Sequence, residues 1–207
     1  MKLLMDVDAL AKFSNWNLVA HVPGALGFDT SQCATVSSLR YRAQQSVHKP
    51  DQKLFHTPDA AAQALEIIGQ MSPLASLNPI QLAPFEDVVG IDPGEAILFA
   101  EVLAIPETFV LTGDKRALRS LSALDAGLRA GLSGRVVLIE QVLLRLLDQN
   151  DLDWIRRHVC PAKSLDKAVS AIMGSRCDAN EGSVRQGLAS YIGEIARLFE
   201  PPLVITP

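Results

Sequence analysis

The sequence has little cysteine and no pattern of it that binds metal. Cysteine occurs three times in 207 residues, as Cys33, Cys160 and Cys177. There is no CxxC motif, and no cysteine or histidine spacing of the kind that holds zinc. We therefore expect three free, buried thiols in a reducing compartment.

Long hydrophobic runs are also missing. Polar side chains interrupt the longest apolar stretches, at Glu101, Glu140, Gln141 and Arg145. A membrane-spanning helix needs about 20 apolar residues, so we expect no contact with a membrane. Residues 1–5 are too short for the hydrophobic part of a signal peptide, and Asp6 ends them. The expected location is the cytoplasm.

Aromatic residues and positive charge are scarce as well. Aromatics make up 5% of the chain, and its net charge is −4, which argues against a surface that coats nucleic acid generally. A nuclease remains compatible with this charge, because bound divalent cations offset a cluster of acids. Hydrophobic residues make up 48%, enough for a core rich in Leu, Ile, Val and Ala.

The central stretch, 91–104, predicts a buried helix. Asp92 can cap it, Pro93 suits its first position, and Glu95 can close a capping box. The residues that follow are apolar on nearly every side, and several share a face with Glu95. A carboxylate beside an apolar stripe needs a partner, either a backbone amide or a metal ion.

Two predicted strands end in aspartate. Residues 2–6 form an apolar run that ends at Asp6, and residues 109–114 form another that ends in Thr112 and Asp114. Asp8 is expected to cap the helix after the first strand, which leaves Asp6 for a functional role. Because ligands bind at the C-terminal ends of parallel strands, we expect Asp6, Asp114 and the central acids to share one edge of a sheet.

Basic residues suggest where phosphates would approach. Lys115 and Arg116 lie in the first turn of a helix, where cations oppose the helix dipole unless an anion binds. A second basic segment lies near residues 40–53 and includes Arg40 and Arg42 beside Tyr41. The segment is either a strip that contacts RNA phosphates or an ordinary solvated face.

Other elements are expected on both sides of the central helix. We predict a short strand at 34–36, a helix from Ser37, a helix from Thr57 to about Met71, a connector at 72–84, a strand at 85–91, a helix from 115 to about 124, another at 123–132 and a strand at 135–139. Beyond Asp151 the pattern is helical, with a capping box at Ser183 and Gln186, until Pro201-Pro202 ends the last helix. Residues 203–205 are short enough to be an edge strand.

Three motifs together resemble the PIN-domain ribonucleases. They are Leu4-Met5-Asp6, Asp92-Pro93-Gly94-Glu95-Ala96 and Leu111-Thr112-Gly113-Asp114-Lys115-Arg116. The resemblance covers about residues 1–150 and implies a Rossmann-like, three-layer α/β fold with a mostly parallel central sheet. Residues 151–207 would be a helical C-terminal extension packed on it.

The resemblance also implies an activity and its residues. The activity is cleavage of RNA phosphodiester bonds, with single-stranded RNA as the expected substrate and Mg²⁺ or Mn²⁺ as cofactor. Asp6, Glu95 and Asp114 match the family's acidic positions, and Asp92 is a candidate additional ligand. Thr112, Lys115 and Arg116, with Arg40 and Arg42, are the candidate substrate-binding residues.

The sequence departs from the family at one place. The family usually carries a Glu on the helix after its second strand, and residues 35–42 contain no acid. This gap leaves open a PIN-like module that binds RNA or protein without cutting, with an antitoxin-like protein or a second copy as partner. The apolar stripe at 183–199 either packs on the sheet domain, which is the commoner outcome, or contacts a second copy of the chain.

A phosphatase is the remaining alternative. Asp6-Val7-Asp8 resembles the opening motif of haloacid-dehalogenase-type phosphatases, with Asp6 as nucleophile and Asp8 as general acid. The later lysine and acidic pair of that family have no clear counterpart, and Glu95 would have no role. Turnover of p-nitrophenyl phosphate would distinguish this alternative from a nuclease.

Overall fold

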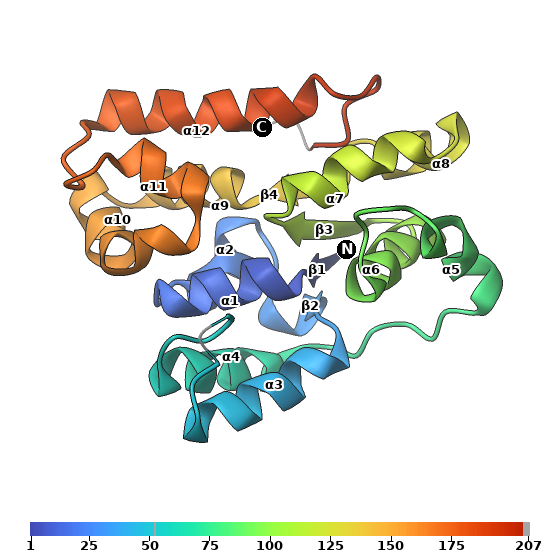
Figure 1. Cartoon of the computed structure of the whole chain (residues 1–207), viewed down its shortest axis with the longest axis horizontal. Helices are drawn as coiled ribbons and strands as arrows, with labels where there is room; N and C mark the ends of the chain where they lie inside the picture. The colour runs from blue at the N-terminus through green and yellow to red at the C-terminus, as the bar shows by residue number, and fades with distance from the viewer. Residues whose placement is uncertain (52, 205–207) are drawn as a thin grey trace.

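The fold, given by a computed structural model, is an α/β arrangement built on one parallel sheet (Figure 1). The structure describes residues 1–51 and 53–204. Within them four strands pair in the order β2–β1–β3–β4, and each pairing is parallel. The predicted Rossmann-like α/β class is confirmed at this level. The strands are β1 (Lys2–Met5), β2 (Cys33–Ala34), β3 (Thr108–Thr112) and β4 (Val136–Leu138).

Helices form the connections between the strands and enclose the sheet. Parallel neighbours need crossover connections, which helices supply. In the part of the chain that is described, the helices are α1 (Val7–Asn15), α2 (Val22–Ala25), α3 (Ser37–His48), α4 (Pro58–Gln70), α5 (Pro79–Glu86), α6 (Pro93–Ala104), α7 (Lys115–Ser120), α8 (Ala126–Leu132), α9 (Ile139–Gln149), α10 (Leu152–Val159), α11 (Lys167–Met173) and α12 (Glu181–Ala196). Short 3₁₀ turns cover Val19–His21, Thr30–Gln32, Leu121–Ala123 and Cys160–Leu165.

The strands are buried on both faces, as parallel strands between helices must be. The side chains of Leu3, Leu4 and Met5 are fully buried, and so are those at the centre of β3. Helices α1 and α6 both pack on β3. In Figure 1, α3 and α4 lie at the β2 end of the sheet and α12 lies at the β4 end.

The segment between α4 and α6 differs from the sequence expectation. Residues 72–84 were expected to be a connector, but α5 (Pro79–Glu86) forms within and beyond them, capped by Asn78. The strand expected at 85–91 does not form, because Phe85 belongs to α5 and packs fully buried against Phe99 of α6. An apolar run of this length fits a helix end as well as a strand.

Two predicted helix caps are wrong. Ser37 is the first residue of α3, and the N-cap position is held by Val36, whose side chain cannot accept a hydrogen bond. The last helix begins at Glu181, three residues earlier than a cap at Ser183 predicts, because the Asn180 side chain accepts from the amide of Ser183. The predicted caps at Thr57 and Asp92 are confirmed, and Asp151, which was expected to begin a helix, is the N-cap of α10.

The C-terminal helices pack on the β4 side of the sheet. Helix α12 contacts α9, α11 and α7, and Val204 pairs with Val136 of β4 as a parallel bridge. The strand predicted at 203–205 is therefore seen only at Val204, since Ile205 lies outside the described residues. Val184, Leu188 and Ile195 on the apolar stripe are buried, so most of the stripe is covered within the chain. Leu198 at its end is 43% exposed. Among the described residues, no helix is both long and apolar enough to cross a bilayer.

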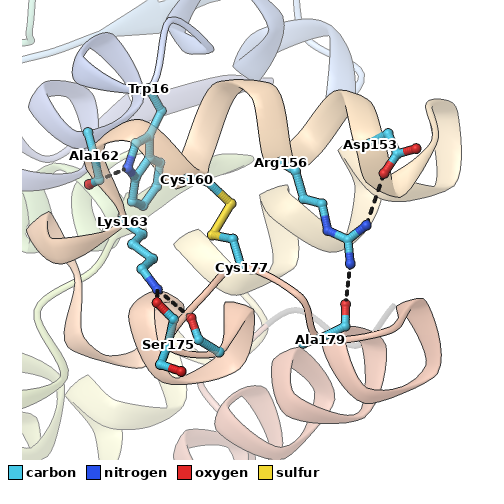
Figure 2. Close-up of a disulfide and its surroundings, with 10 residues drawn as sticks. Trp16, Asp153, Arg156, Cys160, Ala162, Lys163, Ser175, Cys177 and Ala179 are labelled. Carbon is cyan, nitrogen blue, oxygen red and sulfur yellow. Dashed lines mark hydrogen bonds and ion pairs between the residues drawn. A yellow bond between two sulfur atoms is a disulfide. The ribbon is translucent and has the colours of Figure 1, made fainter.

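A disulfide closes the C-terminal segment (Figure 2). Cys160 and Cys177 are joined, which contradicts the expectation of three free thiols, while Cys33 is free and buried. The two cysteines are 17 residues apart in the chain. They meet because the 3₁₀ segment Cys160–Leu165 packs against α11, which Cys177 follows. Structural disulfides persist mainly in oxidising compartments, so cysteine content no longer indicates a reducing one.

The disulfide should contribute measurably to stability. Replacing both Cys160 and Cys177 by Ser should lower the free energy of unfolding by about 3 kcal/mol, because a loop of this length loses its closure constraint in the unfolded chain. For a chain of this size, thermal denaturation should show a fall in Tm of roughly 6–12 °C. Dithiothreitol should produce the same fall in the wild type and none in the double variant. Equal melting of oxidised wild type and double variant would contradict the prediction.

Candidate functional site

The alignment of β1 with β3 brings two predicted site residues together. Met5 pairs with Leu111, and the amide of Asp6 donates to the carbonyl of Leu111 at 2.9 Å. The next residue on each strand is therefore Asp6 on one side and Thr112 on the other. We call this end of the sheet the carboxyl edge, since both strands end there.

Asp6 is a buried carboxylate at this edge. Its side chain is 5% exposed, and its two oxygens accept from the amide of Val7 at 2.7 Å and from the hydroxyl of Thr112 at 3.2 Å. Asp6 is therefore the N-cap of α1, and the prediction that Asp8 would take that role is wrong. A chain that turns directly from strand to helix places the last strand residue at the cap.

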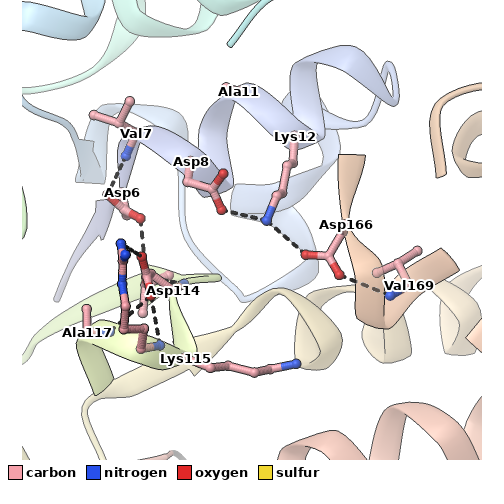
Figure 3. A network of polar contacts seen from close by, with 12 residues as sticks. Asp6, Val7, Asp8, Ala11, Lys12, Asp114, Lys115, Ala117, Asp166 and Val169 are labelled. Atoms are coloured by element: carbon pink, nitrogen blue, oxygen red, sulfur yellow. Dashed lines mark hydrogen bonds and ion pairs between the residues drawn. The ribbon is translucent and has the colours of Figure 1, made fainter. Parts of the chain in front are cut away.

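Thr112 links Asp6 to Asp114. Its buried hydroxyl donates to Asp6 and accepts from the amide of Asp114 at 3.1 Å. One Asp114 oxygen caps α7 by accepting from the amides of Arg116 and Ala117. The other is 3.3 Å from the guanidinium of Arg116, which is 80% exposed. Figure 3 shows Asp6 at the start of α1 and Asp114 at the start of α7.

The N-terminus of α6 supplies the other two predicted acids. Asp92 and Glu95 form the predicted capping box, each accepting the other's backbone amide at 2.8 Å. Glu95 is 7% exposed. The box uses one oxygen of each carboxylate, Oδ1 of Asp92 and Oε2 of Glu95, and the second oxygen of each makes no hydrogen bond with the described chain.

The pKa values of Asp6 and Glu95 are raised in part by the charges of neighbouring acids. The pKa of Asp6 is raised to about 7. Burial is the largest cause, the charges of Asp8 and Asp92 add to it, and the hydrogen bonds from Val7 and Thr112 act in the opposite direction. Burial also raises the pKa of Glu95 to about 7, with further contributions from Asp6, Asp92 and Asp114. The charges of Asp6 and Asp114 thus act on Glu95, and both Asp6 and Asp114 adjoin Thr112 at the carboxyl edge.

The carboxylate oxygens of these acids are the ligand type that a hard divalent cation prefers. Their arrangement, however, is not that of a complete metal site. Mg²⁺ is commonly held by one or two carboxylates, with water and phosphate as the other ligands. Desolvated carboxylates that repel each other would gain from such a cation. Yet no group of three or more His, Cys, Asp or Glu side chains in residues 1–51 and 53–204 is arranged to hold a metal ion. The four acids would have to shift to coordinate one together.

Lys115, expected to hold phosphate, points away from the carboxyl edge. Its ammonium group pairs with the buried carboxylate of Glu140 at the start of α9 and lies 4.1 Å from the centre of the Tyr191 ring on α12. The other oxygen of Glu140 is buried and unpartnered among the described residues. Arg116 remains at the edge, where its exposed guanidinium contacts Asp114.

The sequence analysis missed a second lysine near the edge. Lys12 bonds to Asp8 at 2.6 Å and to Asp166 of the C-terminal segment at 2.9 Å (Figure 3). Burial works to lower the pKa of Lys12, but the two carboxylates outweigh it and raise the pKa above its usual value. The i,i+4 spacing of Asp8 and Lys12 was a visible signal for half of this network, and Asp166 was not predictable.

Arg40 and Arg42, the two arginines of the basic segment predicted to bind substrate, have different surroundings. Arg42 pairs with Asp51 at 2.9 Å. Arg40, three residues after Ser37 on α3, makes no hydrogen bond or ion pair with the described chain and lines a cavity with Thr35 and Val36. Helix α3 carries no acid, so the position at which the resembled family has a Glu is not filled from this helix.

Comparison with known proteins adds no relative. No protein-family model matches the chain, no curated protein matches it, and no solved structure does. Statements about function therefore depend on the residues and geometry described above.

The raised pKa values predict how stability depends on pH. Between about pH 4 and 7 the folded protein holds more protons than the unfolded chain, so its free energy of unfolding should fall as pH rises. For Asp6, a change from 3.8 to about 7 corresponds to roughly 4 kcal/mol. Urea denaturation in EDTA at about pH 4 and about pH 7, the two ends of this window, measures it.

An Asp6→Asn variant isolates the contribution of Asp6. It should be more stable than the wild type at the higher pH, because the amide is neutral and still accepts from Val7. Asp151→Asn is the matched control, since Asp151 is an exposed N-cap on α10 and should leave the pH dependence unchanged. A wild type whose stability rises between the two pH values would show that these carboxyls are not desolvated.

Proposed function

We propose that this chain is a PIN-type, divalent-metal-dependent ribonuclease that hydrolyses phosphodiester bonds in single-stranded RNA. The observation that carries the proposal is the mutual electrostatic influence of Asp6, Asp92, Glu95 and Asp114 at one carboxyl edge. Four acids from distant parts of the sequence gather there without an equal number of cations. Such an arrangement favours binding of a divalent cation and, through it, a phosphate.

Each residue has a role in the proposed reaction. Glu95 and Asp92 each offer an oxygen that their capping box leaves free, and Asp6 offers carboxylate oxygens oriented by Thr112. When bound, Mg²⁺ or Mn²⁺ would lower the pKa of a water and stabilise charge on the phosphate. In the proposed hydrolysis, the water oxygen would bond to phosphorus as one ester P–O bond breaks, and the proton that the water loses would pass to the leaving oxygen. Arg116 is free to turn from Asp114 to an RNA phosphate, because it is exposed.

The role of Asp114 can be tested without losing its helix cap. Asp114→Asn keeps a capping side chain, since Asn caps about as well as Asp, but removes the charge. Mn²⁺-dependent cleavage of a fluorescent single-stranded RNA should fall by about 100-fold or more, equivalent to about 2.7 kcal/mol of transition-state stabilisation. Asp125→Asn is the matched control, because Asp125 caps α8 in the same way outside the edge. EDTA should stop wild-type cleavage, and unchanged cleavage by Asp114→Asn would overturn the assignment.

The second candidate is a non-catalytic module of the same fold that binds RNA or a protein. It is favoured by one observation: the described residues contain no ready-made group of metal ligands, and both oxygens of Asp6 and of Asp114 already have partners. Such a module would bind single-stranded RNA equally in EDTA and Mn²⁺ and leave it intact. Cleavage by the purified protein that EDTA abolishes would exclude this candidate.

A further inference from the structure

A cavity of about 490 Å³ lies beside the carboxyl edge. Its lining comes from the start of α3, the end of α4 and the segment after it, residues 71–74. Polar groups from Thr35, Ser37 and Arg40 share it with the apolar side chains of Ile68, Met71 and Leu74. The volume lies within the usual range for pockets that bind small organic ligands.

Two contacts place this cavity next to the acids. The hydroxyl of Thr35 donates to the carbonyl of Met5 at 2.8 Å, and Met5 is the residue immediately before Asp6. The side chain of Val36 lies 4.0 Å from the position that a Cβ on Gly94 would occupy, between Asp92 and Glu95. The cavity therefore adjoins the proposed cleavage site.

The outer wall of the cavity is held in place. The amide of Ser72 donates to the carbonyl of Cys33 at 2.9 Å, so this segment is fixed to the end of β2. Lys2 donates to the carbonyl of Pro73, and the amide of Ala75 donates to Glu101. Lys2 and the fully buried Glu101 are themselves an ion pair at 2.6 Å. A wall fixed in this way need not be ordered when a ligand binds, which favours affinity.

The lining has the chemistry of a nucleotide site. Arg40 is exposed and without a partner in the described chain, so its guanidinium is available for a phosphate. Ser37 is three residues earlier on α3, and positions three apart lie on one side of a helix. Apolar side chains on the opposite wall offer a surface for a base, which carries a flat apolar face.

We propose that this cavity binds one nucleotide of a single-stranded RNA next to the scissile phosphate, with the phosphate at Arg40 and the base against Met71 and Leu74. The placement next to a scissile bond rests on the proposed function, whereas nucleotide binding by the cavity does not. The cavity thereby selects a flexible, unpaired strand, because a base inside a duplex is stacked and cannot enter.

The proposal is tested by binding in EDTA, where metal-dependent cleavage is absent. The probes are adenosine 5′-monophosphate, adenosine, inorganic phosphate and a single-stranded RNA hexanucleotide, followed by amide chemical shifts of the isotope-labelled full chain. We expect the hexanucleotide and the monophosphate to shift Thr35, Ser37 and Met71. Adenosine and phosphate alone should each bind more weakly, since each lacks half of the contacts.

Two variants locate the phosphate contact. Arg40→Ala should weaken hexanucleotide binding by about tenfold, the size of one charge-assisted contact. Arg145→Ala is the matched control, because Arg145 is also an exposed helical arginine without a partner in the described chain, but on α9 and outside the cavity. Shifts confined to other surfaces, no binding at all, or equal affinities for wild type and Arg40→Ala would overturn the proposal.

Cleavage assays separate this proposal from the proposed function. If wild type cuts RNA with Mn²⁺ while Arg40→Ala changes neither the dissociation constant nor KM, the nucleotide site fails and the nuclease stands. If the hexanucleotide binds at the cavity in EDTA while no metal yields cleavage, the nuclease fails and the nucleotide site stands.

Discussion

The parallel pairing of β1 with β3 is the constraint on which the rest of the site depends. Its alignment makes Asp6 and Thr112 neighbours at the carboxyl edge, and their hydrogen bond joins two segments 106 residues apart in the chain. Thr112 in turn accepts from Asp114, so the start of α7 is fixed to the same point. Without this alignment, the acids at the ends of the two strands would not meet.

Burying several acids close together costs free energy, and a nearby cation offsets this cost for some of the acids but not for others. Asp8 is compensated by Lys12, whereas Asp6 and Glu95 keep raised pKa values because burial and like charges act on both. Carboxyl groups with strongly shifted pKa values cluster at functional sites. The uncompensated pair therefore points to the carboxyl edge as the functional region, while the capping bonds of Asp92 and Asp114 give these two acids a structural role as well.

The C-terminal helices are part of the environment of the edge. Asp166 holds Lys12 beside Asp8, and Tyr191 lies under the ammonium group of Lys115. The disulfide between Cys160 and Cys177 encloses the segment that carries Asp166, so it restrains the position of this carboxylate. Residues 151–204 therefore do more than cover the sheet, because they position both lysines nearest the proposed site.

Local signals determined much of this protein from its sequence alone. The Asp92–Glu95 capping box, the strands that end in Asp6 and Thr112, and the stripe on α12 were all readable, since each depends on a few neighbouring residues. What needed the tertiary structure were the contacts between distant segments. Lys115 pairs with Glu140, and Cys160 forms a disulfide with Cys177. Residues 85–91 do not form the predicted strand, since α5 extends to Glu86. These outcomes depend on which surfaces pack together, and a local pattern of residues carries no information about its distant partner.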